Sequence, residues 1–513
     1  MKIALISTNT YPGDQGLRTV SSYLKEKGFE TKMIFLPYVE DYSKLYSKKI
    51  ILQILNLCKD CNLIGISSMA STSKRAIQVI KNLKRLNVPL IWGGVHATIS
   101  PESCIPYVNY VCVGEGEEAI YELARAIKEK QEPKEIAKIK NLWINKGDIV
   151  IKNVLRPLEE NLDKLPFADF SLNEHYLLDG ENLRKFKEED LNGMIFFQTE
   201  RGCPHACTYC INKKIKDIQK GLGKIVRAHS IDYVIRNLVY LKNKFKTLKY
   251  FDLRDETFFV RSLDEIKEFS IRYKQEVGLR FKILGDPANI TDEKMKLLVE
   301  AGLTDIIIGI QSGSDKINKE VYKRYITKEQ VLNSARIINK YKNKLTVMYD
   351  IIACNPYENR QDVLDSIELI MKIPSPFFLS VNNLVFFTGS ELYEKAKQDG
   401  IIKTEKDSAS NLNYWDRFKH IKLKKKNMYL TLILNLMRGV VTKSRLGIMP
   451  RNILKILINK KMITFNEKVK IFTLMVGRIV QIMDMFREKI AKPIYRNTPL
   501  SFKIWYDKRR YQV

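Results

Sequence analysis

Residues 194–213 read Met-Ile-Phe-Phe-Gln-Thr-Glu-Arg-Gly-Cys-Pro-His-Ala-Cys-Thr-Tyr-Cys-Ile-Asn-Lys. An apolar, β-prone run leads into a turn at Gly202, and three cysteines follow within eight residues: Cys203, Cys207 and Cys210. Three thiolates this close in sequence can face one centre, which suits a soft metal or an iron–sulfur cluster. A structural zinc site needs four ligands, and His205 is the only other candidate in the loop. Three ligands would leave one iron of a cubane cluster open to a small molecule.

The Cys-x3-Cys-x2-Cys spacing, with Tyr209 before the last cysteine and Gly-Cys-Pro-His at the start, resembles the cluster loop of radical S-adenosylmethionine (SAM) enzymes. The resemblance implies that the three cysteines hold a [4Fe–4S] cluster and that Tyr209 contacts a cofactor. It also implies that the open iron binds SAM through its amino and carboxylate groups and that SAM is reduced to a 5′-deoxyadenosyl radical. A zinc or disulfide loop is the alternative.

The composition describes a soluble globular protein of two or three domains. The chain has 513 residues, 45% hydrophobic and 28% charged. We expect no N-terminal signal, and no run reaches the ~18 apolar residues of a membrane span. Eight unevenly spread cysteines do not form a secreted disulfide framework, so a reducing cytoplasm is expected. Four of them are predicted to be structural: Cys58, Cys61, Cys104 and Cys112.

Residues 1–130 alternate between short apolar runs and amphipathic patterns. Strands are predicted at Lys2–Ser7, Thr31–Leu36, Leu63–Ser67, Leu90–Trp92 and Tyr110–Val113. Helices are predicted at Gly16–Lys27, Lys48–Cys58, Ser73–Leu86 and Glu117–Lys130. This alternation predicts an α/β domain with a doubly wound, Rossmann-like parallel sheet.

Small residues gather at three of the predicted strand ends, where such sheets bind their ligands. They are Ser67 and Ser68, then Gly93 and Gly94, and then Gly114, Glu115 and Gly116. They clear a broad floor for a large flat ligand. The Gly-Gly-x-His-Ala-Thr and Val-Gly-Glu-Gly-Glu stretches resemble the cobalamin-binding domain that precedes many radical SAM domains, which implies that these residues contact cobalamin.

The loop after the first strand departs from other cobalamin domains. Those domains supply a cobalt-binding histidine from an Asp-x-His-x-x-Gly loop, whereas residues 9–16 contain no histidine. The resemblance therefore implies a lower cobalt face without a protein imidazole. We expect His96 to hydrogen-bond the ligand or the backbone instead. The alternative is a Rossmann-like domain that has lost its ligand or binds another one.

Three further regions follow the first domain. Residues 131–192 are predicted to be a linker with a small hairpin, residues 193–384 a second α/β domain, and residues 385–513 a helical, strongly basic region. The strands of the second domain are predicted at Met194–Gln198, Lys249–Leu253, Arg280–Leu284, Asp305–Ile310, Leu345–Ile352 and Phe377–Val385. Its helices are predicted at Ile231–Phe245, Leu263–Val277, Asp292–Ala301, Lys328–Tyr341 and Arg360–Lys372. Six repeats fit the partial (β/α)6 barrel of radical SAM enzymes.

Residues at the carboxyl ends of the barrel strands are the candidate SAM contacts. Asp255 and Glu256 could accept a hydrogen bond from the methionine amine, although an N-cap and first-turn acid is the structural alternative. Gln311 and Ser312 suit ribose or methionine hydrogen bonding. Cys354 replaces part of a Gly-x-Pro-Gly segment common in relatives, and a small buried residue is the alternative to a thiol facing substrate.

The positive charge is concentrated near the C-terminus. The whole chain carries a net charge of +29, and residues 415–513 contain 24 lysines and arginines but 5 acidic residues. Amphipathic helices are predicted at Asn427–Val441, Asn452–Ile463 and Val469–Phe486. They could form a helical cap with a solvated basic face, or lie on an anionic membrane surface. The dispersed basic residues and the lack of a recognised module argue against nucleic acid.

Taken with the resemblance, the sequence predicts a cobalamin-dependent radical SAM enzyme. The reaction that the resemblance implies is methyl transfer to an unactivated carbon or phosphinate, with a cyclisation or rearrangement as the alternative. The resemblance extends to the family of anaerobic magnesium-protoporphyrin ester cyclases. The expected partners are a small-molecule, lipid-like or peptide substrate and a reductant such as flavodoxin or ferredoxin. The expected location is the cytoplasm, at the membrane periphery if the basic helices bind lipid.

Two further alternatives remain. The Gln-Ser-Gly-Ser-Asp stretch at 311–315 resembles methylthiotransferases, but those enzymes hold a second cluster on three N-terminal cysteines whose usual settings are missing here. A non-enzymatic regulator that binds cobalamin or zinc is the other. It would have no need of three cysteines at the mouth of a β/α barrel.

Overall fold

The computed structural model describes residues 1–9, 12–37, 44–404 and 427–469. The chain forms two compact units. Unit 1 comprises Met1–Glu256, Gln275–Leu279 and Val385–His420; unit 2 comprises Thr257–Lys274, Arg280–Leu384 and Ile421–Val513. The boundary between units therefore falls at the end of the second barrel strand, whereas we predicted the domain boundary at residues 192–193.

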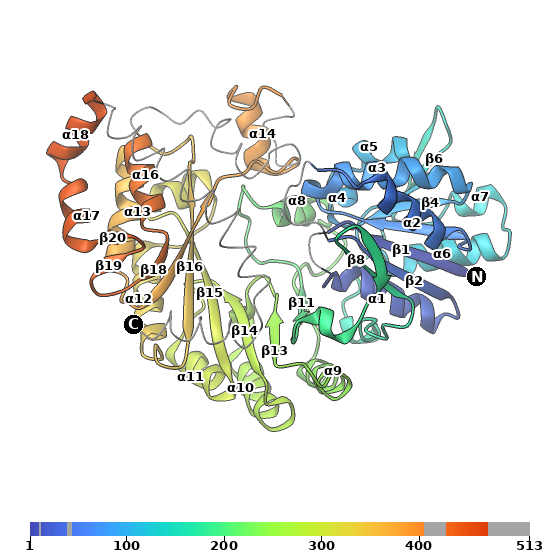
Figure 1. Cartoon of the computed structure of the whole chain (residues 1–513), viewed down its shortest axis with the longest axis horizontal. Coiled ribbons are helices and arrows are strands. Elements are labelled where there is room, and N and C mark those ends of the chain that lie inside the picture. The colour runs from blue at the N-terminus through green and yellow to red at the C-terminus, as the bar shows by residue number, and fades with distance from the viewer. Residues whose placement is uncertain (10–11, 38–43, 405–426, 470–513) are drawn as a thin grey trace. The chain divides into compact units, whose positions relative to one another are not determined.

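Five parallel strands form the centre of the first sheet in unit 1 (Figure 1). They are β1 (Lys2–Ser7), β2 (Glu30–Phe35), β3 (Leu63–Ser67), β4 (Leu90–Gly93) and β5 (Tyr110–Cys112), in the order β5-β4-β3-β1-β2. This confirms the predicted doubly wound sheet. The strand order changes direction between β1 and β3, and ligands of such sheets bind at that point.

Helices cover both faces of this sheet. On one face, α1 (Gln15–Glu26) contacts α6 (Glu117–Lys128); on the other, α2 (Lys48–Cys58) contacts α3 (Ser73–Leu83). The core between sheet and helices is apolar and includes the fully buried Trp92. The predicted helix at 73–86 finishes as a tighter turn over Lys84–Leu86, which ends at Asn87 in a left-handed conformation.

The segment predicted as a linker completes both edges of the first sheet. The expected hairpin is present as β6 (Leu142–Asn145) and β7 (Val150–Lys152), and it pairs antiparallel with β5. A second hairpin, β8 (His175–Asp179) and β9 (Asn182–Lys185), joins the other edge next to β2. The linker prediction is corrected because apolar residues of both hairpins pack on the core of the first sheet.

The rest of unit 1 carries the cysteine loop. β10 (Met194–Phe197) pairs in parallel with β13 (Tyr250–Leu253), and the short β11 (Glu200–Arg201) pairs with β12 (Arg227–Ala228). The cysteine loop follows β11 and runs into α8 (Ile211–Ile218). The other α-helices in the described part of unit 1 are α4 (Gly94–Ile99), α5 (Pro101–Cys104), α7 (Pro133–Ile136), α9 (Ile231–Lys244) and α14 (Glu391–Gln398).

Unit 2 contains four more parallel strands in chain order: β14 (Arg280–Gly285), β15 (Leu303–Gln311), β16 (Thr346–Ala353) and β17 (Phe377–Asn383). The helices α10 (Leu263–Arg272), α11 (Asp292–Ala301), α12 (Lys328–Asn339) and α13 (Arg360–Lys372) contact one another in succession along the outer side (Figure 1). Buried and partly exposed residues alternate along most of β15 and along β16. These elements confirm the predicted strand–helix alternation.

The C-terminal part of unit 2 differs from the predicted run of helices. The helix expected at Asn427–Val441 ends early, as α16 (Met428–Leu436). Three short strands follow: β18 (Gly439–Val441), β19 (Arg445–Leu446) and β20 (Met449–Pro450). Gly439 and Gly447, both at positive φ, allow the backbone to turn there. The helices α17 (Arg451–Leu457) and α18 (Lys460–Val469) come next, and the helix predicted at Val469–Phe486 falls almost entirely outside the described residues.

Candidate cofactor cavity

A cavity of about 790 Å³ in unit 1 brings the two predicted sites together. Its floor is formed by the carboxyl ends of β3, β4 and β5, and its wall by the segment from β10 to α8. Nine of the predicted site residues line it: Ser67, Ser68, Gly93, Gly94, Gly114, Glu115, Gly116, Cys203 and Glu256. The strand ends of the first sheet and the first cysteine of the loop therefore share one cavity.

Two glycines keep the floor free of side chains. Gly94 has φ +87°, and a Cβ there would lie 2.8 Å from Ser67 Oγ. Gly114 has φ +88°, and Thr98 Oγ1 accepts a hydrogen bond from its N–H over 3.1 Å. Backbone rather than side chain thus forms the floor at the ends of β4 and β5, as close approach of a large ligand requires.

Asp14 organises the bottom of the cavity at the point where the strand order changes direction. One of its carboxylate oxygens accepts hydrogen bonds from Ser7 Oγ (2.9 Å), Asn9 Nδ2 (2.8 Å) and Ser67 Oγ (3.2 Å). The other caps α1 through the N–H of Leu17. The hydroxyl of Ser67 is therefore occupied by the protein, which leaves its small size as its contribution to the floor.

Ser68 is occupied in a similar way. Its hydroxyl accepts a hydrogen bond from Trp92 Nε1 over 2.9 Å, and its carbonyl accepts one from the N–H of His96. His96 lies in α4 and does not line the cavity. Its ring packs on Trp92, its Nε2 lies 3.4 Å from Ser103 Oγ, and burial lowers its pKa to about 4. The side chain of His96 therefore packs inside the protein and does not face the cavity.

Glu115 belongs to an ion-pair network between the two halves of the cavity. Its carboxylate lies 2.5 Å from Arg227 Nη2 and 3.2 Å from Arg201 Nη1, and Arg201 Nη2 lies 2.6 Å from Glu117 Oε1. Arg227 also donates to the carbonyl of Glu159. Burial alone would raise the pKa of Glu115, but Arg227 and Arg201 outweigh it and hold the pKa below its usual value. We call these four charged residues, 115, 117, 201 and 227, the inter-loop network.

The turn that leads into the cysteines depends on Gly202. It has φ +93°, and a Cβ at this position would lie 2.2 Å from the carbonyl oxygen of Ile225. No larger residue fits without moving the backbone. The amide of Gln15 makes a second tie to this region, since it accepts from the N–H of Gln198 (2.6 Å) and donates to the carbonyl of the same residue (3.2 Å).

The three cysteines lie in one loop and form no disulfide. Cys207 is buried, and Cys203 and Cys210 are partly exposed. Among the described residues, no three His, Cys, Asp or Glu side chains are close enough to share a single metal ion. This is compatible with a cluster, because thiolates that each bind a different iron lie farther apart than ligands of one ion. Burial raises the pKa of Cys203 to about 12, and the charges of Glu256 and the other two cysteines add to this rise, so thiolates here need a cationic partner.

Asp255 and Glu256 have different environments. Asp255 is buried, and its carboxylate accepts hydrogen bonds from the N–H of Thr199 (2.6 Å), the N–H of Glu200 (3.1 Å) and the hydroxyl of Thr199. It holds the segment before Gly202. Glu256 instead lines the cavity, where it is open to solvent but enclosed by protein on its other sides. This enclosure raises its pKa, although Asn212 donates a hydrogen bond to it.

The remaining predicted site residues lie in unit 2. Gln311 ends β15 with φ +68°, and its side chain lies so close over Gly309 that a Cβ there would be 2.4 Å from Gln311 Nε2. Ser312 is buried, and its hydroxyl accepts a hydrogen bond from the N–H of Ser314 over 3.2 Å. Cys354 is also buried, with its thiol 3.0 Å from Asn383 Oδ1, which favours the interpretation as a small buried residue.

Sequence reasoning missed several residues of the cavity. Asp14, Gln15, Arg201, Asn212 and Arg227 line it, but none belongs to a recognisable motif. Of these, Asp14 was the most accessible to prediction, because an acid directly before a helix is a capping signal and Asp14 immediately precedes α1. The other contacts join residues far apart in sequence, such as Gln15 and Gln198, and no local pattern reports them.

Comparison with known proteins agrees with this geometry. Residues 1–124 match the B12 binding domain family, and residues 198–370 match the radical SAM superfamily. The chain therefore contains a B12 binding domain followed by a radical SAM domain. Its cofactors are a [4Fe–4S] cluster and SAM, which the radical SAM domain implies, and cobalamin, which the B12 binding domain implies.

Two curated relatives span most of the chain. Bacteriochlorophyllide d C-8(2)-methyltransferase of Chlorobaculum tepidum is 20% identical over 68% of this chain and 72% of its own length. Cytidylyl-2-hydroxyethylphosphonate methyltransferase of Streptomyces wedmorensis is 22% identical over 77% and 79%. Among solved structures, the radical SAM methyltransferase TsrM from Kitasatospora setae, with tryptophan substrate and a SAM analogue bound, aligns with a TM-score of 0.62 at 17% identity. That alignment covers 79% of this chain and 77% of TsrM.

Proposed function

We propose that this protein is a cobalamin-dependent radical SAM methyltransferase that methylates an unactivated carbon or phosphinate of a small molecule. One observation carries the proposal: the strand ends of the B12 binding domain and the first cluster cysteine line the same cavity. When bound, the cluster supplies the electron that cleaves SAM and cobalamin supplies a methyl carrier. Both curated relatives described above are methyltransferases, which supports transfer over cyclisation.

The proposed residue roles follow from the contacts. Cys203, Cys207 and Cys210 ligate the cluster. Glu256 accepts the methionine amine of SAM, because its carboxylate faces the cavity whereas that of Asp255 is used by Thr199 and Glu200. Asp255 then acts by positioning the backbone before the cluster loop.

The strand-end glycines and serines form the cobalamin floor. Gly94 and Gly114 let the cofactor approach the backbone, while Asp14 fixes Ser67 and the start of α1. The described residues that line the cavity include one histidine, His229. Its Nδ1 lies 3.1 Å from Asp163 Oδ1, and its ring stacks on Tyr233. This supports a lower cobalt face without a protein imidazole. Tyr209, Gln311 and Ser312 remain proposed contacts of the cluster and SAM.

Anaerobic reconstitution with iron, sulfide and hydroxocobalamin tests the function. After addition of SAM and reductant, S-adenosylhomocysteine would report methyl donation and 5′-deoxyadenosine would report radical cleavage. Alanine variants of Cys203, Cys207 and Cys210 should lose 5′-deoxyadenosine, whereas Cys104→Ala, a buried cysteine outside the loop, should keep it. Formation of 5′-deoxyadenosine without S-adenosylhomocysteine would favour the cyclisation or rearrangement alternative, and zinc alone in a colourless protein would favour the regulator.

We also propose that the basic C-terminal region contacts an anionic membrane surface, next to a lipid-like substrate. Its high positive charge supports this, and none of the described helices is long and apolar enough to span a bilayer. Flotation with vesicles containing anionic lipid should carry the full chain upwards, and neutral vesicles should not. Equal behaviour with both vesicle types would leave the region as a helical cap.

A further inference from the structure

Electrons must reach the cluster from outside once per SAM cleavage, and α8 is the first helix after its last cysteine, Cys210. The segment 211–224 contains five lysines and one aspartate. The helix is tied to the cysteine loop by Lys216, whose Nζ donates to the carbonyl of Pro204 over 3.2 Å. Its charges are therefore fixed relative to the cluster loop.

The two sides of α8 differ in what they face. The residues that line the cavity are Asn212, Ile215, Lys216 and Gln219, which fall on one side of the helix at i, i+3, i+4 and i+7 spacing. The opposite side carries Lys213, Lys214, Asp217 and, one turn on, Lys220. Lys213 pairs with Asp217, at 2.5 Å between Nζ and Oδ2. Asp217 therefore does not neutralise Lys214 or Lys220.

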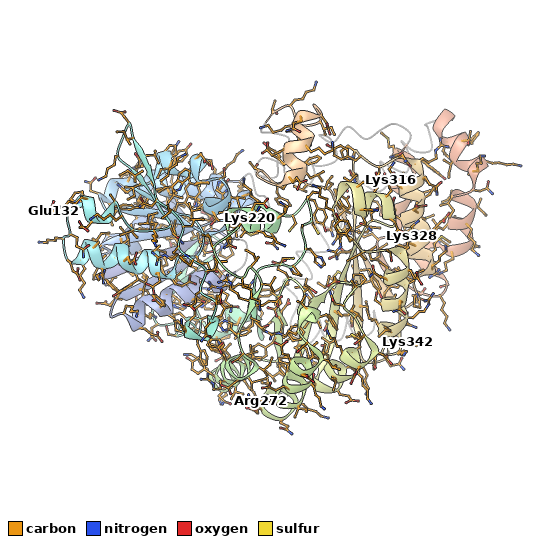
Figure 2. The ribbon with its side chains drawn as sticks, turned by 180° about the vertical axis from the view of Figure 1, so that it is seen from behind. Glu132, Lys220, Arg272, Lys316, Lys328 and Lys342 are labelled. Carbon is orange, nitrogen blue, oxygen red and sulfur yellow. The ribbon has the colours of Figure 1, made fainter. Side chains whose placement is uncertain are left out.

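The lysines beyond the helix stand on an ordered turn. The carbonyl of Leu222 accepts a hydrogen bond from the N–H of Leu158 over 2.7 Å, and the N–H of Leu222 donates to the carbonyl of Gln219. Lys220 and Lys224, on either side of this turn, are exposed, and neither has a carboxylate partner among the described residues. Lys220 lies at the end of α8 in Figure 2. We define Lys214, Lys220 and Lys224 as the α8 lysine face.

We propose that the α8 lysine face is the docking surface for an acidic one-electron carrier protein. Electron-transfer encounters use small, electrostatically steered interfaces, and a fixed cluster of lysines beside the cluster loop meets both requirements. The inference rests on the proposed function, since it assumes a cluster that must be reduced. The electron balance is simple for a flavin carrier: its anionic hydroquinone gives one electron and becomes the neutral semiquinone, and the cluster goes from the 2+ to the 1+ state.

The test uses the cluster-loaded full chain and measures the rate of cluster reduction by stopped-flow absorbance. The probe is a recombinant bacterial flavodoxin in its hydroquinone form, at low and high salt. The charge-reversal variant is Lys220→Glu with Lys224→Glu. It should lower the second-order rate about tenfold at low salt and remove most of the salt dependence. Photoreduced 5-deazariboflavin, a small uncharged reductant, should reduce the variant as fast as the wild type.

A matched control separates docking from the overall charge of this basic protein. Lys342 and Lys344 are exposed in the turn before β16, at the amino end of the unit 2 strands, and Lys342 is marked in Figure 2. Reversing this pair changes the net charge equally and should leave the flavodoxin rate within about twofold. An equal fall in the control, or a wild-type flavodoxin rate in the Lys220/Lys224 variant, overturns the docking surface alone. A fall with 5-deazariboflavin assigns the effect to structure, and wild-type protein that takes up no cluster refutes the proposed function as well.

Discussion

Arg201 donates to Glu117 across 2.6 Å, and this pair joins the residue before the Gly202 turn to the first residue of α6. The two residues are 84 positions apart in the chain. Together with Glu115 and Arg227 they hold the loop after β5 next to the start of the cysteine loop. The inter-loop network therefore fixes the loop after β5 relative to the start of the cysteine loop.

Breaking the network should destabilise unit 1. Arg201→Met leaves Glu117 and part of Glu115 without a cation in a largely buried setting, so we expect a loss of about 1–3 kcal/mol in the free energy of unfolding. Urea denaturation of the cofactor-free protein measures it. Lys138→Met is the control, because its pair with Glu135 is exposed and should contribute less than about 1 kcal/mol. Equal losses would mean that the network has no special role.

Gly202→Ala should damage the cluster loop far more than Gly221→Ala. Both glycines have positive φ, but a Cβ at 202 meets the Ile225 carbonyl at 2.2 Å whereas a Cβ at 221 meets nothing within 4 Å. The control variant should cost about 1 kcal/mol from backbone strain alone. The iron content after reconstitution should fall several-fold only in Gly202→Ala. Similar iron contents in the two variants would contradict this view of the turn.

The two neighbouring acids should give opposite phenotypes. Asp255→Asn places an amide N–H₂ where Thr199 and Glu200 already supply donors, so stability and iron content should both fall. Glu256→Gln should leave both unchanged and raise the dissociation constant for SAM about tenfold, since a charged acceptor is lost. Thermal unfolding, iron analysis and equilibrium dialysis with SAM separate the two outcomes. The assignment fails if Asp255→Asn alone weakens SAM binding.

Glu358 should make the stability of unit 2 fall as pH rises. Burial raises the pKa of Glu358 from 4.5 to about 8, so the folded chain keeps its proton where the unfolded chain loses it. The stabilisation is complete below pH 4.5 and is lost progressively up to about pH 8. The urea midpoint of Glu358→Gln should therefore rise relative to that of the wild type between pH 5 and 8. Above pH 8 the difference between the two midpoints should stay constant. The exposed Glu329→Gln is the control, and a constant offset at every pH would contradict the prediction.

Local patterns in the sequence were sufficient to predict the strand ends and the cysteine loop. The elements predicted in residues 1–130 and the strands β14–β17 follow hydrophobic periodicity, and their boundaries shift by only a residue or two in most cases. The sequence also indicated a carboxylate at the end of β13. It could not tell Asp255 from Glu256, because neighbouring residues at a strand end point to opposite sides.

Long-range contacts explain what the sequence could not reveal. The pairing of hairpins 142–152 and 175–185 with opposite edges of one sheet depends on strand order, which no local pattern contains. The same holds for Gln15 with Gln198 and for the inter-loop network. The early end of α16 was a different error, since an apolar helical pattern continued past Gly439, whose positive φ breaks the helix.

The two hairpins at the edges of the first sheet affect how the protein behaves before its cofactors arrive. Both outermost strands are short, and each carries basic side chains, Lys152 on β7 and Arg184 and Lys185 on β9. Short, charged edge strands discourage pairing with the sheet of another molecule. The freshly made apoprotein should thus resist aggregation through this sheet while its cavity is still empty, which favours recovery of soluble chain for later loading with iron and corrinoid.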